Sequence, residues 1–465
     1  MKTIRQRGML EKVKPKLFGS SGVRGLVNVD LTPVLAEQIG LALATFSKAR
    51  TVLVGRDTRV SSPMIEDALV SGLLAGGTNV CCVGIVPTPV LAFLTRELGA
   101  DAGAMITASH NPPQYNGIKI FNKDTVAYDE KSQGKIEKIL ENQSFKFADW
   151  RDVGEARSID GNSLYVETIT KNVKLDKNWH VVVDAGCGAT HKLAPLIFKS
   201  LGCKVAALNS QPDGVFPARS PEPNAESLKP LANIVKEIGA DLGVGYDGDG
   251  DRVAFVDEKG VFVDFDRALA AYAGHVVKTE GGGVVVTNAE ASMCVEKMVE
   301  THGGEVMRTK VGDVYVSEAI KKHKAMFGGE PCGAWVHPQI HYCPDGILSS
   351  VLLLKALEDE KKRLAKFIAE APAYHVLREN IACRNSMKDK IVKEACEALK
   401  SVFPAYKDFS TVDGVRLALA NGWVLVRASG TEPVLRLTVE GESLKAAKAI
   451  MEKGVKLVKK LVGGG

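Results

Sequence analysis

Short apolar runs rich in Val, Ile and Ala alternate along most of the chain with longer segments whose apolar residues recur at helical spacing. This alternation predicts strand–helix–strand units joined by right-handed crossovers. The strand-like runs fall into three successive sets of three, which indicates an internal repeat. The expected strands are residues 51–57, 79–83 and 102–106 in the first set, 181–186, 204–208 and 241–245 in the second, and 284–288, 305–308 and 324–327 in the third.

The pattern changes near residue 373. A helix is expected over 388–402, a hairpin-like pair of strands over 422–426 and 435–440, and a Lys-rich amphipathic helix over 444–461. We therefore predict an α/β protein with three related α/β domains and a smaller C-terminal α+β domain. The expected domains are residues 1–160, 161–262, 263–371 and 372–465.

In open α/β sheets, ligands bind beyond the carboxyl ends of the strands. The third strand of each set should therefore end in a functional loop. These loops are residues 107–111, 246–252 and 328–334. If the three domains face one cleft, the three loops converge there.

The most informative stretch is residues 105–120, where an apolar strand gives way to Ser109, His110 and two prolines, with Lys119 ten residues beyond the serine. A hydroxyl, an imidazole and an ammonium at one strand end suit phosphoryl transfer, because an oxygen takes the group while cations hold its charge. An ordinary Ser or Asx turn before Pro112 explains the same residues equally well.

Asp247, Asp249 and Asp251 alternate with glycines, and Arg252 follows them. Such hard oxygen ligands suit Mg²⁺ or Ca²⁺. A solvated acidic turn is the alternative, but three close carboxylates repel unless a cation lies between them. A calcium EF-hand, with Glu258 as its last ligand, is disfavoured because Arg252 replaces the required glycine and strand-like residues flank the loop.

Three other loops carry weaker indications, each explained equally well by an ordinary turn. Residues 19–25 form a glycine- and serine-rich loop with one guanidinium, Arg24, and residues 328–335 offer one carboxylate on a glycine-rich turn, as sugar recognition would need. Residues 427–433, with Arg436 beyond them, offer a guanidinium, two hydroxyls and a run of amides, which suits a phosphate.

The composition narrows the class of protein. At 465 residues the chain exceeds the size of one hydrophobic core, and its net charge of +5 is dispersed, which argues against nucleic acid as a partner. Nine cysteines without a CxxC pair fit a reducing, cytoplasmic setting. The basic residues 1–16 are expected to form a disordered arm, and neither a signal peptide nor a membrane span is expected. The oligomeric state, including a homo-oligomer, is left open.

Together, residues 107–112, 247–252, 329–333 and 427–433 resemble the motifs of the α-D-phosphohexomutase superfamily in order and spacing. The resemblance implies a four-domain, heart-shaped architecture with mixed sheets around a central cleft. It implies that Ser109 becomes a phosphoserine and shares Mg²⁺ with the three aspartates. It also implies that Glu330 and Cys332 bind sugar hydroxyls and that the distal phosphate binds to Arg427, Ser429, Gly430 and Thr431, with Arg436 beside them.

Arg24, His110, Lys119 and Arg252 match positions that assist transfer in this superfamily, and His110 and Lys119 are the candidates for general acid–base work. Residues 308–316, with Lys310 and Asp313, resemble the phosphoglucosamine mutases, in which this stretch lies near the sugar. The sugar loop most resembles that of archaeal members. Many relatives, however, have Ser and His where this chain has Cys332 and Ala334.

The resemblance implies a mutase that moves phosphate between O6 and O1 of a hexose through phosphoserine and a bisphosphate, with hexose 1,6-bisphosphate as activator. Glucosamine 6-phosphate is the expected substrate. Phosphoglucomutase or phosphomannomutase activity is the near alternative. A metal-dependent sugar phosphatase and a non-catalytic calcium or sugar-phosphate binding protein are further alternatives.

Overall fold

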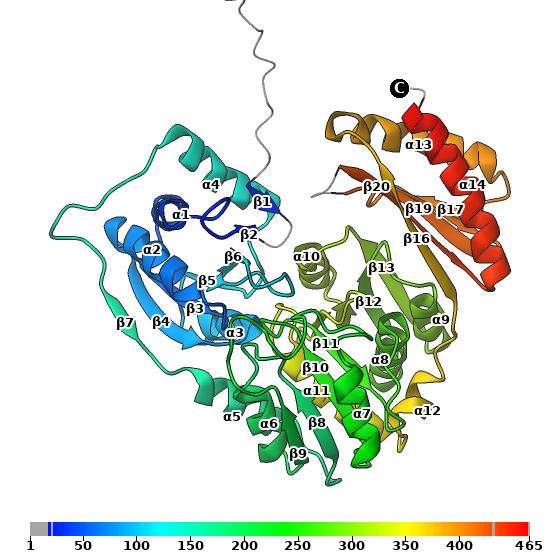
Figure 1. Cartoon of the computed structure of the whole chain (residues 1–465), viewed down its shortest axis with the longest axis horizontal. Helices are drawn as coiled ribbons and strands as arrows, with labels where there is room; N and C mark the ends of the chain where they lie inside the picture. The colour runs from blue at the N-terminus through cyan, green and yellow to red at the C-terminus, as the bar shows by residue number, and fades with distance from the viewer. Residues whose placement is uncertain (1–16, 20–21, 430–432, 464–465) are drawn as a thin grey trace, which may run out of the picture.

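The computed structural model describes residues 17–19, 22–429 and 433–463. Within these residues the strands form four sheets, which follow one another along the chain (Figure 1). The basic residues 1–16 and three residues of the expected phosphate loop, Gly430, Thr431 and Glu432, lie outside the described part.

The first sheet shows how the apolar alternation of the chain builds two cores. Val52 and Val54 point to one face, against α1 (Pro33–Ser47) and α2 (Ser62–Ala75), whereas Leu53 belongs to the core on the other face, with α3 (Thr88–Glu97). The strand order is β1 (Phe18–Gly19), β2 (Gly22–Leu26), β6 (Tyr115–Asn122), β5 (Ala102–Ile106), β3 (Thr51–Arg56), β4 (Asn79–Ile85) and β7 (Ala156–Ser158), with α4 (Glu130–Asn142) following β6.

The next two sheets repeat the centre of the first. The second has the order β11 (Val253–Val256), β10 (Leu242–Tyr246), β8 (His180–Asp184) and β9 (Lys204–Leu208), accompanied by α5 (Asn162–Asn172), α6 (Leu193–Ser200) and α7 (Lys229–Glu237). The third has the order β13 (Gly304–Thr309), β12 (Gly283–Asn288), β14 (Phe327–Gly329) and β15 (Trp335–Val336), accompanied by α8 (Phe265–Glu280), α9 (Cys294–Thr301), α10 (Asp313–His323), α11 (Gly346–Asp359) and α12 (Leu364–Ile368).

In each of these three sheets the first strand of the predicted set lies between the second and the third and runs parallel to both. The third strand then pairs with an antiparallel strand, β6, β11 or β15. The sheets are therefore mixed, and the internal repeat is confirmed. The exact domain boundaries stay a prediction.

The structure corrects several of the local predictions. Arg427, predicted on a loop, lies on β19 (Gly422–Ala428). The strand expected at residues 324–327 begins only at Phe327, because Lys324 has φ 51° and caps the end of α10. Gly328 and Gly329, predicted as loop, therefore belong to β14. Arg24, predicted to lie on a loop, lies on β2, which pairs with β6.

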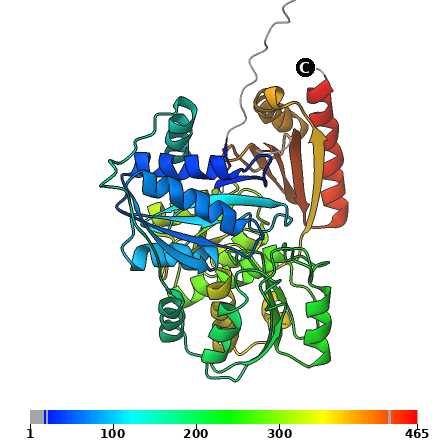
Figure 2. The same cartoon turned by 60° about the vertical axis from the view of Figure 1, so that its left-hand side comes forward.

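The fourth sheet is wholly antiparallel, and α13 and α14 pack together on it (Figure 2). Its order is β16 (His375–Ala382), β20 (Val434–Gly441), β19 (Gly422–Ala428), β18 (Val415–Leu419) and β17 (Asp408–Ser410), with the short 3₁₀ helix η1 (Asn385–Met387), α13 (Lys388–Val402) and α14 (Leu444–Gly463). In Figure 1 the first sheet lies at the upper left and the fourth at the upper right, and the second and third sheets lie between and below them. None of the helices in the described ranges is long and apolar enough to cross a membrane.

Candidate active site

Ser109 lies on the loop that follows β5 and is almost completely buried. Its φ of 52° is in the left-handed region, which a residue with a side chain adopts at a cost. The Ser109 hydroxyl donates to Asp247 Oδ2 at 2.6 Å and lies 3.3 Å from His110 Nδ1. The nucleophile candidate of the first unit and the acidic loop of the second are therefore in direct contact.

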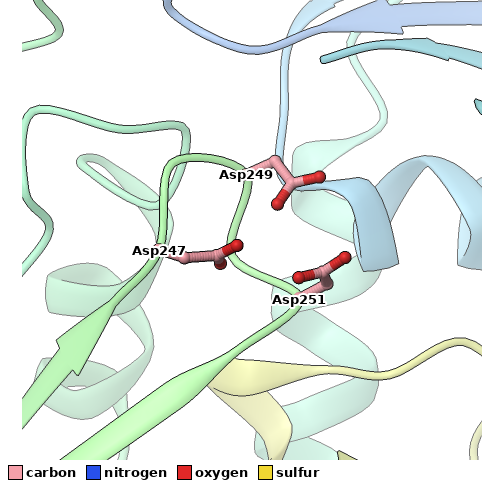
Figure 3. A group of neighbouring side chains, drawn as sticks. All are labelled: Asp247, Asp249 and Asp251. Atoms are coloured by element: carbon pink, nitrogen blue, oxygen red, sulfur yellow. The ribbon is translucent and has the colours of Figure 1, made fainter. Parts of the chain in front are cut away.

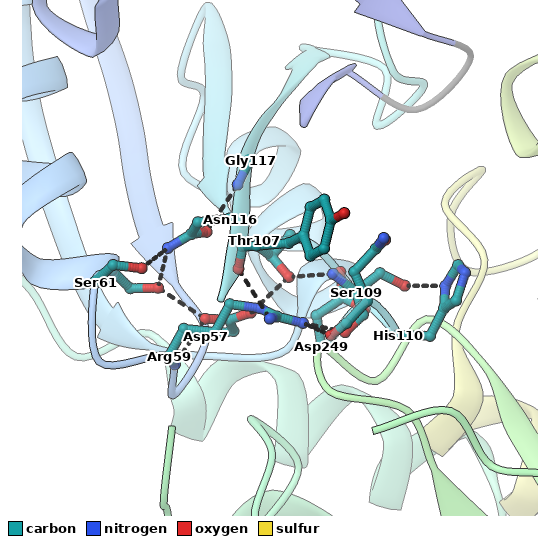
Figure 4. A network of polar contacts seen from close by, with 12 residues as sticks. Asp57, Arg59, Ser61, Thr107, Ser109, His110, Asn116, Gly117 and Asp249 are labelled. Atoms are coloured by element: carbon teal, nitrogen blue, oxygen red, sulfur yellow. Dashed lines mark hydrogen bonds and ion pairs between the residues drawn. The ribbon is translucent and has the colours of Figure 1, made fainter. Parts of the chain in front are cut away.

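A buried ion pair between Asp57 and Arg59, which the sequence analysis did not identify, supports the loop that carries Ser109 (Figure 4). Arg59 Nε donates to Asp57 Oδ2 at 3.0 Å. The two terminal nitrogens of the Arg59 guanidinium donate to the carbonyls of Ser109, Asn111 and Pro112 in the loop after β5, and to that of Tyr115, the first residue of β6. Asp57 is the last residue of a predicted strand, at the edge of the sheet where ligands are expected, and this position was the only sequence signal for it.

Asp247, Asp249 and Asp251 lie on the turn between β10 and β11 and point into a common space (Figure 3). One carboxylate oxygen from each lies within 4.8 Å of the others, and all three residues are buried. Strands flank this loop, and Glu258 accepts from the Ala365 N–H instead of completing it, as expected if the loop is not an EF-hand.

The acidic loop fits a hard divalent cation. Asp249 Oδ1 and Asp251 Oδ1 are buried and have no hydrogen-bond partner among the described residues. Buried anionic oxygens without a donor are costly unless a cation approaches them. Oxygen-only donors of this kind are those that Mg²⁺ prefers.

Cations and hydroxyls of the first unit reach the same carboxylates. Lys119 Nζ donates to Asp249 Oδ2 at 2.9 Å and to Asp251 Oδ2 at 2.6 Å. The Thr88 hydroxyl, which the sequence did not single out, donates to Asp249 Oδ2 at 2.5 Å. Burial and the neighbouring carboxylates of Asp251 and Asp249 raise the pKa of Asp247 well above its usual range.

Lys119 stays charged in this setting. Burial alone would lower the pKa of its ammonium, but the carboxylates of Asp249 and Asp251 raise it above the usual lysine value. His110 is the opposite case, because burial and the guanidinium groups of Arg252 and Arg24 lower its pKa to about 2. A neutral imidazole therefore lies beside the Ser109 hydroxyl. Near it, Arg24 Nη1 donates to Asn111 Oδ1 at 2.9 Å.

The sugar loop of the third unit approaches the acidic loop directly. Val253 N donates to the Gly333 carbonyl at 3.1 Å. Gly333 has φ 84°, and a Cβ there would lie 2.0 Å from the Val253 carbonyl oxygen, so only glycine fits. Glu330 directly follows β14, and its Oε1 accepts from Asn288 Nδ2 at 2.7 Å and from Gly312 N at 2.8 Å.

Arg252 links the two loops, because its guanidinium interacts with the carboxylates of Asp247, Asp251 and Glu330. Burial raises the pKa of the half-buried Cys332 thiol beside them, which keeps it neutral. Asp313 is the first residue of α10, and its charge acts on both Arg24 and Glu330. Lys310 lies close by in sequence, with its Nζ 5.5 Å from the Tyr315 ring centroid. The expected convergence of the three loops is therefore found in the structure.

The expected phosphate site lies on the C-terminal sheet, where β19 and β20 place Arg427 directly opposite Arg436. Like charges at opposed positions destabilise a sheet unless an anion lies near them. Arg427 Nε donates to Glu290 Oε1 of the third unit at 2.6 Å. Ser429 is buried, and its carbonyl accepts from Lys388 Nζ.

Four family models match successive parts of the chain. They describe the α/β/α domains I, II and III and the C-terminal domain of phosphoglucomutase/phosphomannomutase, and they match residues 15–147, 163–260, 264–374 and 379–457. The chain belongs to this family. It is thus a phosphohexomutase-type enzyme, an isomerase that transfers a phosphoryl group.

Relatives within the family cover nearly the whole chain. A probable phosphoglucosamine mutase of Pyrococcus abyssi is 43% identical over 444 residues, which are 96% of this chain and 98% of the relative. A phosphoglucosamine mutase of Methanocaldococcus jannaschii is 43% identical over 450 residues, with the same two coverages. The predicted resemblance to archaeal members is therefore confirmed.

Solved structures of the family share the fold. The crystal structure of a phosphoglucomutase/phosphomannomutase family protein from Burkholderia thailandensis has a TM-score of 0.87 at 28% identity, and the match covers 96% of this chain and 97% of that chain. A putative phosphomannomutase from Thermus thermophilus has a TM-score of 0.80 at 27% identity, covering 96% and 99%. The predicted fold class, α/β with mixed sheets and a smaller C-terminal domain, is confirmed.

Proposed function

We propose that this enzyme interconverts glucosamine 6-phosphate and glucosamine 1-phosphate through a phosphorylated Ser109. The observation that carries the proposal is the 2.6 Å contact between the Ser109 hydroxyl and Asp247, in a loop that leaves two buried carboxylate oxygens without a donor. The choice of amino sugar is supported by relatives named phosphoglucosamine mutase that match almost the whole chain.

Ser109, Asp247, Asp249 and Asp251 would hold Mg²⁺. The ion would neutralise charge on the transferring phosphoryl group. Arg24, Arg252 and the Lys119 ammonium surround the same space and would hold the phosphoryl oxygens. His110, as a neutral imidazole beside the serine oxygen, and Lys119 are the candidates for moving a proton between the serine and sugar hydroxyls.

The reaction would consist of two transfers separated by a reorientation. The bond between phosphorus and Ser109 Oγ breaks as a sugar hydroxyl oxygen takes the phosphoryl group and releases its proton. The resulting bisphosphate turns, and its other phosphate returns to Ser109. Hexose 1,6-bisphosphate would act as an activator because it can phosphorylate Ser109 when that serine carries no phosphate.

Sugar recognition would fall to the third and fourth units. Glu330, with one oxygen fixed by Asn288 and Gly312, can present the other to a hydroxyl of the sugar, with Cys332, Lys310 and Asp313 nearby. Arg427, Ser429, Gly430, Thr431 and Arg436 would hold the phosphate that is not reacting.

Glucose or mannose phosphates are the second candidate substrates. Cys332 and Ala334 depart from the sugar loop of many relatives, and the two structural neighbours described above are named for phosphoglucomutase or phosphomannomutase.

Assaying the purified enzyme with the 1-phosphates of glucosamine, glucose and mannose, with glucose 1,6-bisphosphate as primer, tests the choice. Glucosamine 1-phosphate should give the highest kcat/KM. Equal or faster turnover of either other sugar would contradict the amino-sugar assignment. Phosphate release faster than isomer formation would instead indicate a phosphatase.

A cytoplasmic setting is part of the proposal. All nine cysteines are free in the structure, as a reducing compartment requires.

A further inference from the structure

Each of the three α/β units has an aspartate or an asparagine at the end of its central strand. Asp57 directly follows β3, Asp184 is the last residue of β8, and Asn288 is the last residue of β12. All three are almost completely buried. In each, the Oδ1 atom accepts from the backbone N–H two residues later, at 2.9 Å from Arg59, 2.8 Å from Gly186 and 2.9 Å from Glu290.

The other end of each side chain reaches toward the functional loop that follows the neighbouring strand. Asp57 Oδ2 accepts from Thr107 Oγ1 and from Arg59, and both of these residues bond to the backbone of Ser109. The Thr107 hydroxyl accepts from Ser109 N at 2.9 Å, and Arg59 donates to the Ser109 carbonyl at 2.8 Å (Figure 4). The left-handed backbone of Ser109 is therefore fixed on both sides.

The second unit repeats the arrangement of the first. Asp184 Oδ2 accepts from Arg219 Nε at 2.9 Å. Arg219 Nη2 donates to the Tyr246 carbonyl at 2.7 Å, directly before the first carboxylate of the acidic loop. Each of these two units thus uses an aspartate with an arginine to hold a loop carbonyl.

The third unit has an amide where the others have a carboxylate, and its target explains the exchange. Asn288 Nδ2 donates directly to Glu330 Oε1 at 2.7 Å. An aspartate here would place two buried carboxylates in contact, which is unfavourable without a cation or a proton. The residue type at the shared position is therefore complementary to the loop that it holds.

We propose that Asp57, Asp184 and Asn288 are three equivalent positioning residues, each of which fixes one functional loop: the serine, the carboxylate triad and the sugar-binding Glu330, respectively. This inference rests on the proposed function for the roles of the loops. It predicts that weakening each position damages a different property of the enzyme.

Three variants with three readouts test the inference. Arg59→Lys keeps the charge beside Asp57 but loses the fork that reaches the serine loop, so phosphorylation of Ser109 by glucose 1,6-bisphosphate should slow about a hundredfold, with KM little changed. Arg219→Lys should weaken Mg²⁺ binding, measured by calorimetry with the metal alone, about 10- to 100-fold. Asn288→Asp should raise KM for the sugar phosphate at least about tenfold and leave the other two readouts unchanged.

Arg56→Lys is the matched control. Arg56 is the last residue of β3, directly before Asp57, and its guanidinium pairs with Glu66, not with the loop that carries Ser109. Should Arg59→Lys fail to fold, Thr107→Val removes the hydroxyl between Asp57 and the Ser109 N–H and leaves the ion pair intact. If Asn288→Asp fails to fold, Asn288→Ser removes the amide that donates to Glu330 without adding a charge.

A separate effect of each variant on its own readout would support the inference. Equal changes in all three readouts for every variant, or no change beyond the control, would overturn it. A wild-type enzyme that neither phosphorylates Ser109 nor isomerises sugar phosphates would instead refute the proposed function, while the calorimetric result for Arg219→Lys would still decide whether the second loop is held in this way.

Discussion

At the scale of single residues, the decisive feature is a serine held in a conformation that it would not adopt alone. A left-handed backbone at a residue with a side chain costs about 1–3 kcal/mol and persists only when its surroundings fix it. Thr107 and Arg59 do this from either side of Ser109. The hydroxyl is consequently aimed at Asp247 before any substrate arrives, which removes an ordering cost from the transfer.

The carboxylate of Asp249 should act chiefly on the transition state. We expect Asp249→Asn to lower kcat about a hundredfold or more while KM changes little, because a bound cation neutralises charge that develops during transfer. Steady-state kinetics at saturating Mg²⁺ measure both constants. The exposed Asp176 provides the control variant Asp176→Asn. A variant whose KM rises while kcat is preserved would place Asp249 in ground-state binding instead.

At the scale of elements, the C-terminal hairpin places Arg427 on β19, where we propose that it binds the non-reacting phosphate. We expect Arg427→Ala to raise KM about tenfold or more with a smaller effect on kcat, because a charge-assisted contact to the non-reacting phosphate is lost in ground and transition states alike. Arg378→Ala, an exposed arginine on the edge strand β16 of the same sheet, is the control for a lost guanidinium. An unchanged KM would remove Arg427 from the phosphate site.

Most elements could be predicted from the sequence because strand and helix periodicities are local properties. The expected helix at 388–402 matches α13, and the strand at 204–208 matches β9. The start of β14 could not be predicted, because the left-handed cap at Lys324 gives no periodic pattern. The expectation that ligands bind beyond the carboxyl ends of the strands located the functional loops. It did not reveal Arg59, because the Ser109 carbonyl that it binds lies fifty residues away in sequence.

At the scale of the whole molecule, the active site is assembled from loops that belong to different units. The third unit contacts the second through Gly346 N, which donates to the Gly250 carbonyl at 3.0 Å. The fourth unit contacts the third through buried Glu440, whose Oε2 accepts from Met293 N at 2.9 Å and from Trp423 Nε1 at 2.6 Å. These contacts join the third unit to the units that precede and follow it along the chain.

We expect Glu440→Ala to loosen this docking. The variant leaves the Met293 and Trp423 N–H groups without an acceptor, and each such buried donor costs about 1–3 kcal/mol. Thermal unfolding should begin at a lower temperature, and KM should rise because the phosphate and sugar sites are no longer held together. Glu442→Ala, an exposed glutamate two residues away, is the matched control. An unfolding temperature equal to that of the control would mean that Glu440 does not stabilise the interface.

The central claim is that the Ser109 hydroxyl carries the phosphoryl group. Intact-mass measurement after treatment with glucose 1,6-bisphosphate tests this claim most directly, with Ser109→Ala in parallel. We expect one added phosphoryl group on the wild-type enzyme and none on the variant. A wild-type enzyme that isomerises sugar phosphates yet never gains this mass, or a variant that still gains it, would contradict the account.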